Sequence, residues 1–267
     1  MSLNRPEKRN AISSRMWKEI GNVFRIIGSI GDSCRCALLI GEGKAFCAGI
    51  DISDPNFAFF NTRDEDGSDV ARRYLSFRYK ILDMQQAFSE IEKCAVPVVA
   101  AIHGACIGAG VDLSCCADIR VCCENAQFSI REIKLGLAAD VGTLQRFPKI
   151  VGNDSKVREL CLTGDNFSAV EVSKIGFVSY VFSSEKDLPE RSLEICQKII
   201  GNSPVATSGT KVSLNFSRDH SVSEGLEHIA THNAAALMTD DLAVSFMSKS
   251  SMRDGSAFNN LLPHSKL

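Results

Sequence analysis

The sequence predicts an α/β fold in which buried strands alternate with helices and a helical region closes the chain. Three observations support this fold class. Short apolar runs are separated by segments with helical spacing, two of these runs lead into glycine-rich turns, and the pattern beyond residue 188 is mostly helical. With 267 residues, the chain is long enough for one large core. We therefore expect a core at 1–204 and a helical region with a C-terminal tail at 205–267.

In the N-terminal part of the chain, two helices flank one strand. Ser13 and Ser14 are candidate N-caps for the first helix, whose apolar residues recur every three or four positions up to Ile27. The apolar run at 36–40 predicts a buried strand. A second, long helix is expected at 70–93. Its apolar residues, which we expect to form a core stripe, are Tyr74, Phe77, Ile81, Met84, Phe88 and Ile91.

The middle of the chain repeats the succession of a strand and a glycine turn. The strand at 36–40 leads into a turn at 41–49, and an apolar run at 96–102 leads into a second turn at 104–110 and then a short helix. A further strand is expected at 118–123. The remaining helices are expected at 140–150, 157–162, 169–175, 189–200, 205–216 and 224–238.

Three acidic residues lie in and after the second turn, in a stretch of otherwise apolar character. They are Asp112, Glu132 and Asp140. Free backbone N–H groups at a strand-to-helix turn stabilise a developing anion, and carboxylates beside such a turn can move protons. The stretch 100–140 therefore predicts an active site that stabilises an oxyanion and transfers protons between carboxylates.

Each of these acids also has a purely structural interpretation. Asp112 would lie in the first turn of a helix, where the helix dipole favours a carboxylate. Glu132 is flanked by Arg131 and Lys134 and could be half of a surface ion pair. Asp140 precedes a helix and could be its N-cap. Taken one at a time, the three residues leave both interpretations open.

The composition argues against several other classes of protein. A net charge of −2, a pI near 6.2 and the lack of any Lys/Arg-rich block exclude a general nucleic-acid-binding surface. The eleven cysteines lie mostly in apolar runs without zinc-ligand spacing, so we expect reduced thiols and no metal site. The start of the chain lacks the apolar segment of a secretory signal. Pro97, His103 and Asp112 interrupt the apolar stretch 94–117, so no membrane span is expected.

Common nucleotide-binding and hydrolase motifs do not fit the sequence. Residues 108–110 begin like a dinucleotide-binding fingerprint, but Leu113 stands where its third glycine would be, and no Gly-Lys-Ser/Thr follows as in a phosphate-binding loop. His103 has no matching serine nucleophile motif, so we interpret it as structural. What remains is a pair of backbone N–H donors, one from each turn, that converge on a carbonyl oxygen.

Two segments carry a family resemblance. They are GKAFCAGID at 43–51 and IHGACIGAGVDL at 102–113, and together they resemble the enoyl-CoA hydratase/isomerase (crotonase) family. Within that family, the segment GLAADVGTLQR at 136–146 is similar to the dienoyl-CoA isomerase branch. The likeness extends from Leu3 to Val222, which is most of the chain.

The resemblance implies a fold and an assembly. Crotonase-like proteins are spirals of stacked β-β-α turns with a C-terminal helical region that builds trimers, so a homotrimer or homohexamer is expected. Relatives usually carry a strand before the turn that Leu3-Asn4-Arg5-Pro6 resembles, and this chain begins at that turn. We therefore expect the first strand of the spiral to be absent.

The resemblance also implies roles for individual residues. The backbone N–H groups of Ala48 and Ala109 would form the oxyanion hole, although relatives usually have glycine where Ala109 stands. Glu132 and Asp140 would transfer protons, and Asp112 would tune their pKa values or fix the dienolate. The residues expected to bind the acyl-CoA substrate are Ala48, Gly49, Ile50, Asp51, Ile52 and Ala109.

The implied reaction converts a 3,5-dienoyl-CoA to a 2,4-dienoyl-CoA. Glu132 would remove a proton from C2, the two amides would stabilise the resulting enolate oxygen, and Asp140 would return a proton at C6. CoA is part of the substrate, and no metal or redox cofactor is needed. Two alternatives remain: a 2-enoyl-CoA hydratase, in which Asp112 and Glu132 activate water, and a catalytically silent scaffold with the same fold.

The C-terminal tripeptide Ser265-Lys266-Leu267 is typical of a peroxisomal address. Such an address is read by an import receptor, which makes that receptor an expected partner. Because the chain start lacks a secretory signal, the tripeptide predicts a peroxisomal location.

Overall fold

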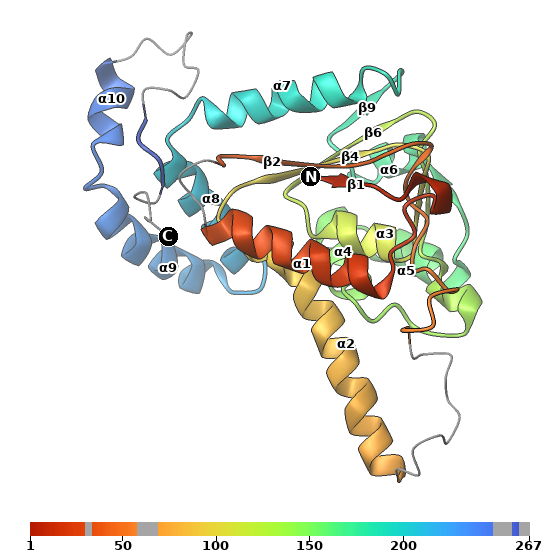
Figure 1. The fold of residues 1–267 in the computed structure, drawn as a ribbon. Helices are drawn as coiled ribbons and strands as arrows, with labels where there is room; N and C mark the ends of the chain where they lie inside the picture. The colour runs from red at the N-terminus through yellow and green to blue at the C-terminus, as the bar shows by residue number, and fades with distance from the viewer. Residues whose placement is uncertain (30–33, 58–68, 248–257, 262–267) are drawn as a thin grey trace.

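The computed structural model describes residues 1–29, 34–57, 69–247 and 258–261. Strands alternate with helices up to residue 182, and helices follow (Figure 1). The strands are β1 (Ser2–Leu3), β2 (Ala37–Gly41), β3 (Ala45–Cys47), β4 (Val98–Ile102), β5 (Ala105–Ile107), β6 (Ile119–Cys123), β7 (Gln127–Ser129), β8 (Phe167–Ser168) and β9 (Tyr180–Phe182). The helices are α1 (Ser14–Ser29), α2 (Val70–Lys93), α3 (Ala109–Cys115), α4 (Thr143–Val151), α5 (Asp154–Thr163), α6 (Ala169–Lys174), α7 (Leu188–Ile200), α8 (Pro204–Ser217), α9 (Val222–Ala236), α10 (Asp241–Met247) and the 3₁₀ helices η1 (Pro6–Lys8) and η2 (Arg131–Leu135).

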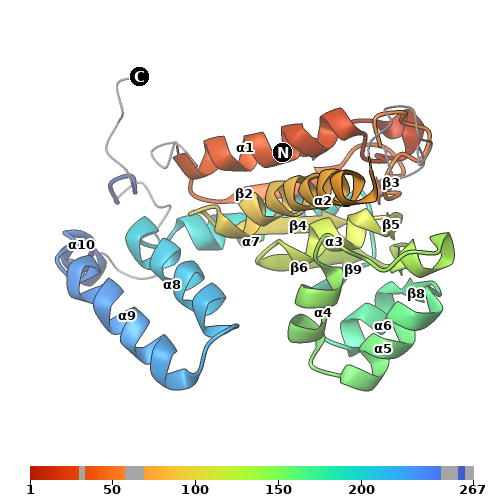
Figure 2. The same cartoon turned by 90° about the horizontal axis from the view of Figure 1, so that it is seen from below.

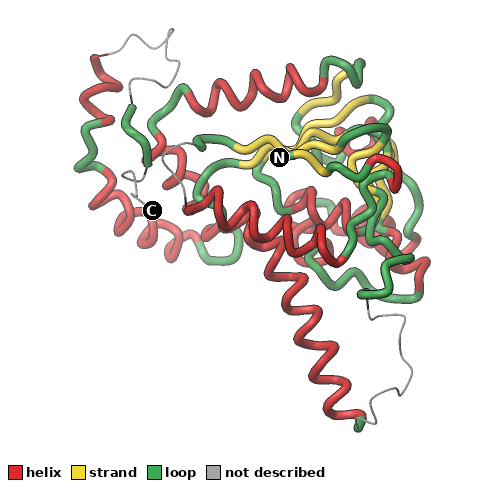
Figure 3. The backbone as a smooth tube through the Cα atoms, in the orientation of Figure 1, coloured by secondary structure: helices red, strands yellow, loops and turns green. Residues whose placement is uncertain are grey.

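The strands form two sheets that the chain visits alternately. One sheet is parallel throughout with the order β1-β2-β4-β6-β9, and the other has the order β3-β5-β7-β8 with one antiparallel pair at its end. The successions β2-β3-α2 and β4-β5-α3 are two turns of the same design. This arrangement confirms the predicted crotonase-like spiral, and Figure 3 shows its strands running side by side between helices.

The parallel sheet is buried on both faces, as its apolar sequences predict. Every residue of β4 is buried, and alternate residues point to opposite sides. On one side, Ala101 packs with Val121 against Leu188 of α7. On the other side, Ala100 and Ile102 belong to the larger core beneath α1 and α3. Helices on both faces therefore hold the carboxyl ends of β4 and β6 in place, next to the second glycine turn.

Helix α1 packs closely against the C-terminal part of α2. A side chain at Gly21 would place its Cβ 2.9 Å from Ala87 Cα, so only glycine allows this approach. The indole of Trp17 stacks on Phe88 with the ring centroids 4.3 Å apart. The hydroxyl of Ser13 accepts a hydrogen bond from Met16 N, which confirms the expected N-cap.

Helix α2 has the predicted bounds but not the predicted burial. Its buried residues are Ala87, Phe88 and Ile91, all near the C-terminal end. In the N-terminal half, Tyr74 is 64% exposed, and Figure 1 shows this half projecting from the body of the molecule. The expected core stripe over the whole helix is therefore wrong, because helical spacing shows which residues share a face but not whether another element covers it.

The expectation that the first strand is absent also needs correction. Ser2 and Leu3 form the short strand β1, which pairs in parallel with Ile40 and Gly41 of β2. Leu3 is 1% exposed, and the terminal amino group of Met1 donates to Leu38 O at 2.8 Å. A strand of only two residues therefore occupies this edge of the parallel sheet, where no strand was expected.

The C-terminal helices extend away from the sheets (Figure 2). Helix α8 is joined to the core by Lys211, whose buried ammonium lies 2.8 Å from Asp118 Oδ2 and donates to Ile91 O and Val96 O. Helix α10 was not predicted from the sequence. The exposed apolar residues of this region are Leu214, Val222, Leu226, Leu237, Met238, Leu242, Phe246 and Met247. Within the described ranges, no helix is long and apolar enough to cross a membrane.

Candidate active site

The two glycine turns meet where β3 and β5 end. These strands pair in parallel, so the turn at 48–51 and the turn at 108–112 leave the sheet side by side. A Cβ on Gly110 would lie 2.9 Å from Cys47 O, and a Cβ on Gly49 would lie 3.1 Å from Ile107 O. Gly49 also has a φ of +100°, which side chains rarely adopt. Glycine is therefore required for the close approach of the two turns.

The second turn presents a free backbone donor at Ala109. This residue opens helix α3, and no acceptor in the described part of the chain pairs with its N–H. The preceding N–H, of Gly108, donates to Ser129 O at 2.8 Å, which holds the turn against β7. The geometry at Ala109 is compatible with the predicted oxyanion donor.

In the first turn the expected donor is wrong. The N–H of Ala48 donates to Arg9 O at 3.0 Å, so the fold itself uses it. The N–H of Gly49 faces Cys47 Sγ at 3.4 Å, and that of Asp51 donates to Ile12 O. Only the N–H of Ile50 has no acceptor among the described residues of this turn. Ile50, rather than Ala48, therefore offers the unpaired N–H of the first turn within the described residues.

Asp112 is the most buried of the three acids. It lies in the first turn of α3 with no exposed surface, and its Oδ1 accepts from Thr143 N at 2.6 Å. Its Oδ2 has no donor in the described residues. Burial, followed by the nearby charge of Glu132, raises the pKa of Asp112 to about 7. Near neutral pH, Asp112 can thus hold a proton that an exposed aspartate would have lost.

Glu132 lies opposite the second turn, in the first turn of η2. A Cβ on Gly108 would come within 3.0 Å of Glu132 Oε1, which places the carboxylate directly over the turn. Burial raises the pKa of Glu132, and the proximity of the Asp112 carboxyl, as a possible donor, opposes that rise. Two carboxyl groups can share a hydrogen bond only if one of them carries a proton, and the fully buried Asp112 is the better proton carrier.

Asp140 lies just before α4 and is half-buried. Burial raises its pKa, and its charge contributes to the raised pKa values of Asp112 and Glu132. Its carbonyl oxygen accepts a hydrogen bond of 2.6 Å from Gln85 Nε2 on α2. The structure therefore brings together all three acids that the sequence singled out.

Two of the structural alternatives for these acids are wrong. Among the described residues Glu132 is in no surface ion pair, because Lys134 pairs with Asp165 and Arg131 donates to Ser129 and Asn166. Asp140 is not the N-cap of α4, because Gly142 holds that position and the first helical N–H is capped by Asp112. The third alternative is partly correct, since Asp112 does lie in the first turn of a helix.

Comparisons with known proteins identify the same family that the sequences of the two turns resemble. The family model described as enoyl-CoA hydratase/isomerase matches residues 1–248. The chain belongs to this family. A mitochondrial Δ(3,5)-Δ(2,4)-dienoyl-CoA isomerase from Homo sapiens is 44% identical over 245 residues, which cover 92% of this chain and 74% of that protein.

A plant relative and a solved structure extend the comparison within the enoyl-CoA hydratase/isomerase family. The peroxisomal Δ(3,5)-Δ(2,4)-dienoyl-CoA isomerase of Arabidopsis thaliana is 44% identical over 240 residues, covering 90% of this chain and 85% of that protein. The crystal structure of an enoyl-CoA hydratase from Bacillus anthracis has a TM-score of 0.82 at 27% identity and covers 95% of this chain and 94% of that chain. The likeness therefore extends over nearly the whole fold.

The residues expected to bind substrate differ in how accessible they are. Ile52 is 63% exposed, whereas Asp51 is buried with its carboxylate engaged by Ser53 and by Arg5 at 2.7 Å. A ligand at the first turn would therefore meet the backbone of Asp51 rather than its side chain. His103 is buried and its Nε2 lies 3.0 Å from Gly43 O, in keeping with a structural role. The described residues contain no group of three or more His, Cys, Asp or Glu placed to hold a metal ion.

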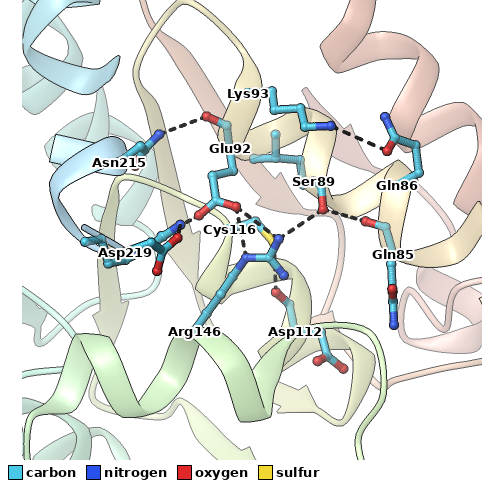
Figure 4. Close-up of polar contacts among 12 residues, drawn as sticks. Gln85, Gln86, Ser89, Glu92, Lys93, Asp112, Cys116, Arg146, Asn215 and Asp219 are labelled. Carbon is cyan, nitrogen blue, oxygen red and sulfur yellow. Dashed lines mark hydrogen bonds and ion pairs between the residues drawn. The ribbon is translucent and has the colours of Figure 1, made fainter. Parts of the chain in front are cut away.

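Sequence reasoning missed the residues that support the site. Gln85 bonds to the backbone of Asp140, while Ser89 and Glu92 bond to Arg146 of α4 (Figure 4). A signal for them exists, because Gln85, Ser89 and Glu92 recur at helical spacing on a helix whose neighbouring face is apolar. That spacing shows a shared polar face, but it does not show which segment the face meets.

Proposed function

We propose that this chain is a Δ(3,5)-Δ(2,4)-dienoyl-CoA isomerase. The enzyme converts a 3,5-dienoyl-CoA to a 2,4-dienoyl-CoA by moving one proton from C2 to C6. The observation that carries the proposal is the convergence of three carboxyl groups with raised pKa values beside two unpaired backbone N–H groups. The names of the relatives, at 44% identity over most of the chain, support the same reaction.

The backbone donors at Ile50 and Ala109 bind the thioester oxygen. When the C2 proton leaves, negative charge develops on this oxygen, and donors that are already oriented stabilise it without rearrangement. Because both donors belong to the backbone, the methyl group of Ala109 leaves its N–H in place. It only narrows the space in which the thioester approaches.

The carboxyl groups divide the proton transfer between them. Glu132 takes the proton from C2, and the electron pair left behind spreads over the thioester oxygen and along the diene to C6. Asp140, which starts protonated, then gives its proton to C6, so the double bonds end between C2 and C3 and between C4 and C5. Glu132 afterwards loses the proton taken from C2 and Asp140 regains one, by exchange with solvent, which restores the starting state. Protonated Asp112 donates to Glu132 and keeps it ionised as the base. Nothing is oxidised or reduced, and the reaction requires no metal or redox cofactor beyond the CoA of the substrate.

A direct assay separates this function from its alternatives. The purified protein is incubated with a 3,5-dienoyl-CoA and, separately, with a 2-enoyl-CoA, and absorbance of the conjugated product or loss of the enoyl group is followed. An isomerase converts the first substrate. Hydration of only the second would replace the proposal with a 2-enoyl-CoA hydratase, and inactivity toward both would indicate a silent scaffold.

We also propose that the enzyme works in peroxisomes. The tripeptide at 265–267, which lies outside the described residues, supports this location. The relatives differ here, since the Homo sapiens protein is named mitochondrial and the Arabidopsis thaliana protein peroxisomal. An N-terminally tagged chain should colocalise with peroxisomes and lose that location when the last three residues are deleted. A tagged full chain that stays outside peroxisomes contradicts the proposal.

The assembly that we propose is a homotrimer or a pair of trimers. Met238, Phe246 and Met247 are each more than 80% exposed, more than a helix facing solvent ordinarily shows. A second copy of the chain would cover such side chains. Sedimentation at micromolar concentration decides the assembly, and a monodisperse monomer contradicts it.

A further inference from the structure

Three polar residues form a stripe along the buried end of helix α2. Gln85, Ser89 and Glu92 are four and three positions apart, so they lie on one face of the helix. Figure 4 shows Ser89 and Glu92 directed toward Arg146, and Gln85 bonds to Asp140 in the segment before it. We call this set the α2 stripe. None of its members belongs to the three acids or to the two backbone donors.

The first member of the α2 stripe holds the backbone of an acid. Gln85 Nε2 donates to Asp140 O at 2.6 Å, across 55 residues of sequence. No other residue that the structure describes bonds to the carboxyl group of Asp140, so the direction of this group depends on the orientation of its own backbone. A donor that fixes the Asp140 carbonyl therefore also restricts where its carboxyl group points.

The other two members hold Arg146, three residues into helix α4. The guanidinium donates from Nη2 to Ser89 Oγ at 3.1 Å and to Glu92 Oε2 at 3.0 Å, and from Nε to Glu92 Oε2 at 3.2 Å. The side chains of Arg146 and Glu92 are only 13% and 16% exposed, so water competes little for this pair. Arg146 is thus fixed by two residues of one helix face.

Arg146 in turn borders the turn that precedes α4. Its guanidinium occupies the space beside Gly142, so that a side chain at 142 would collide with it. The next residue, Thr143, donates its N–H to Asp112 Oδ1 at 2.6 Å. Gln85 therefore restrains the start of the segment 140–143, and Arg146 borders its end. Within this segment, Thr143 contacts Asp112.

We propose that the α2 stripe positions the turn at 140–143, so that Asp140 is directed at the substrate and Thr143 N–H stays on Asp112. Gln85, Ser89, Glu92 and Arg146 are positioning residues, since they act through the turn and touch neither substrate nor reacting atoms. The catalytic part of the inference rests on the proposed isomerase function. The structural part, that α2 restrains this turn, does not depend on it.

Gln85→Met tests the inference against a matched control, Gln86→Met. Methionine keeps the length of the side chain and removes the N–H donor. Gln86 is the next residue, is exposed, and among the described residues bonds only to Glu90 and Lys93 of its own helix. We expect kcat with a 3,5-dienoyl-CoA to fall about tenfold to a hundredfold in Gln85→Met, as a small misplacement of a catalytic group does, with KM near the wild-type value. Gln86→Met should match the wild type.

Hydrogen exchange provides a readout that does not depend on activity. Peptides covering 140–146 should exchange about three- to tenfold faster in Gln85→Met, the effect of one lost hydrogen bond, and at the wild-type rate in Gln86→Met. Arg146→Lys should loosen the same peptides further, because a single ammonium cannot reproduce the fork of bonds to Ser89 and Glu92. Thermal melting checks that each variant is folded.

Each outcome bears on the inference. A loss of kcat confined to Gln85→Met, together with faster exchange at 140–146, supports it. An unchanged kcat, an equal loss in Gln86→Met, or a loss of kcat without faster exchange overturns it. If the wild-type protein fails to isomerise the dienoyl substrate, the proposed function fails, and the exchange comparison still decides whether the α2 stripe restrains the turn.

Discussion

The two glycine turns have the same design but different neighbours. Each follows a strand of the second sheet, and each leaves one backbone N–H without a partner in the described structure, at Ile50 and at Ala109. The first turn continues as loop, and its one acid, Asp51, is neutralised by Arg5. The second turn opens helix α3 and faces Glu132, while Asp112 lies within it.

This difference indicates that the two turns have different chemical roles. An ionised carboxylate paired with arginine has a low pKa and cannot exchange protons near neutral pH, so the first turn can only bind and stabilise charge. The buried carboxyls beside the second turn, which pair with no cation among the described residues, have raised pKa values and can exchange protons. The two turns therefore share the oxyanion, but only the second supports proton transfer.

The largest effect on kcat should come from replacing the two carboxyl groups that transfer protons beside the second turn. Glu132→Gln and Asp140→Asn keep the shape of each side chain and should each lower kcat about 10²- to 10⁴-fold. The two variants differ in deuterated solvent: exchange of the C2 proton is lost in Glu132→Gln and retained in Asp140→Asn, which still forms the dienolate. Near wild-type isomerisation by Asp140→Asn would remove the main support for the isomerase.

Asp112→Asn should lower kcat but raise the free energy of unfolding. The folded chain holds the Asp112 proton up to a pH of about 7, whereas an unfolded aspartate loses it near pH 4. Stability therefore falls as pH rises between these values. Asparagine still accepts from Thr143 N and carries no charge, so urea unfolding should show a flatter pH dependence and greater stability at pH 8. A variant less stable than wild type at pH 8 contradicts the buried-carboxyl interpretation.

The two glycines allow a test of which turn tolerates a side chain. Gly108→Ala and Gly49→Ala both introduce a residue at positive φ, which costs about 1–3 kcal/mol of stability. At Gly108 the new methyl group meets the carboxylate of Glu132, whereas at Gly49 it meets the carbonyl of Ile107. We expect kcat to fall mainly in Gly108→Ala, with KM rising mainly in Gly49→Ala. Equal effects on kcat would show that the turns are not specialised.

The smallest expected effect concerns Asp51, whose contribution to the stability of the fold depends on pH. Hydrogen bonds from Ser53 and the ion pair with Arg5 lower the pKa of Asp51 to about 2. Its contribution to stability, about 2 kcal/mol, is full above pH 4 and is lost as pH falls through 2. Asp51→Asn should be less stable than wild type by that amount at pH 7, and the difference should shrink as pH falls through 2 and vanish below it. A difference independent of pH would assign the effect to packing.

Periodicity and turn chemistry predicted the long elements and the acids, but not the partners of individual groups. The bounds of α2 follow from its spacing, and Asp112, Glu132 and Asp140 follow from acids in an apolar stretch. Strands as short as β5 have too few residues to show alternation. The error at Ala48 has a clear cause, since its N–H is taken by Arg9, a contact that no local pattern contains. The expected N-cap of α4 was wrong for the same reason, because the first helical N–H, of Thr143, is bonded by Asp112 from 31 residues away while Gly142 holds the N-cap position.

The buried ammonium of Lys211 makes the stability of the core depend on a helix that is synthesised after it. Synthesis releases residues 1–204 first, with Asp118 and the carboxylate of Glu92 already in place but without Lys211 and Arg218, their partners on or beside α8. Until α8 emerges, two poorly solvated carboxylates lack these cations, so the core should not reach full stability on its own. A chain that ends at residue 203 should accordingly unfold at a lower urea concentration than one that ends at residue 219. That result would make helix α8 the last piece of the core rather than the first piece of the separate region expected at 205–267.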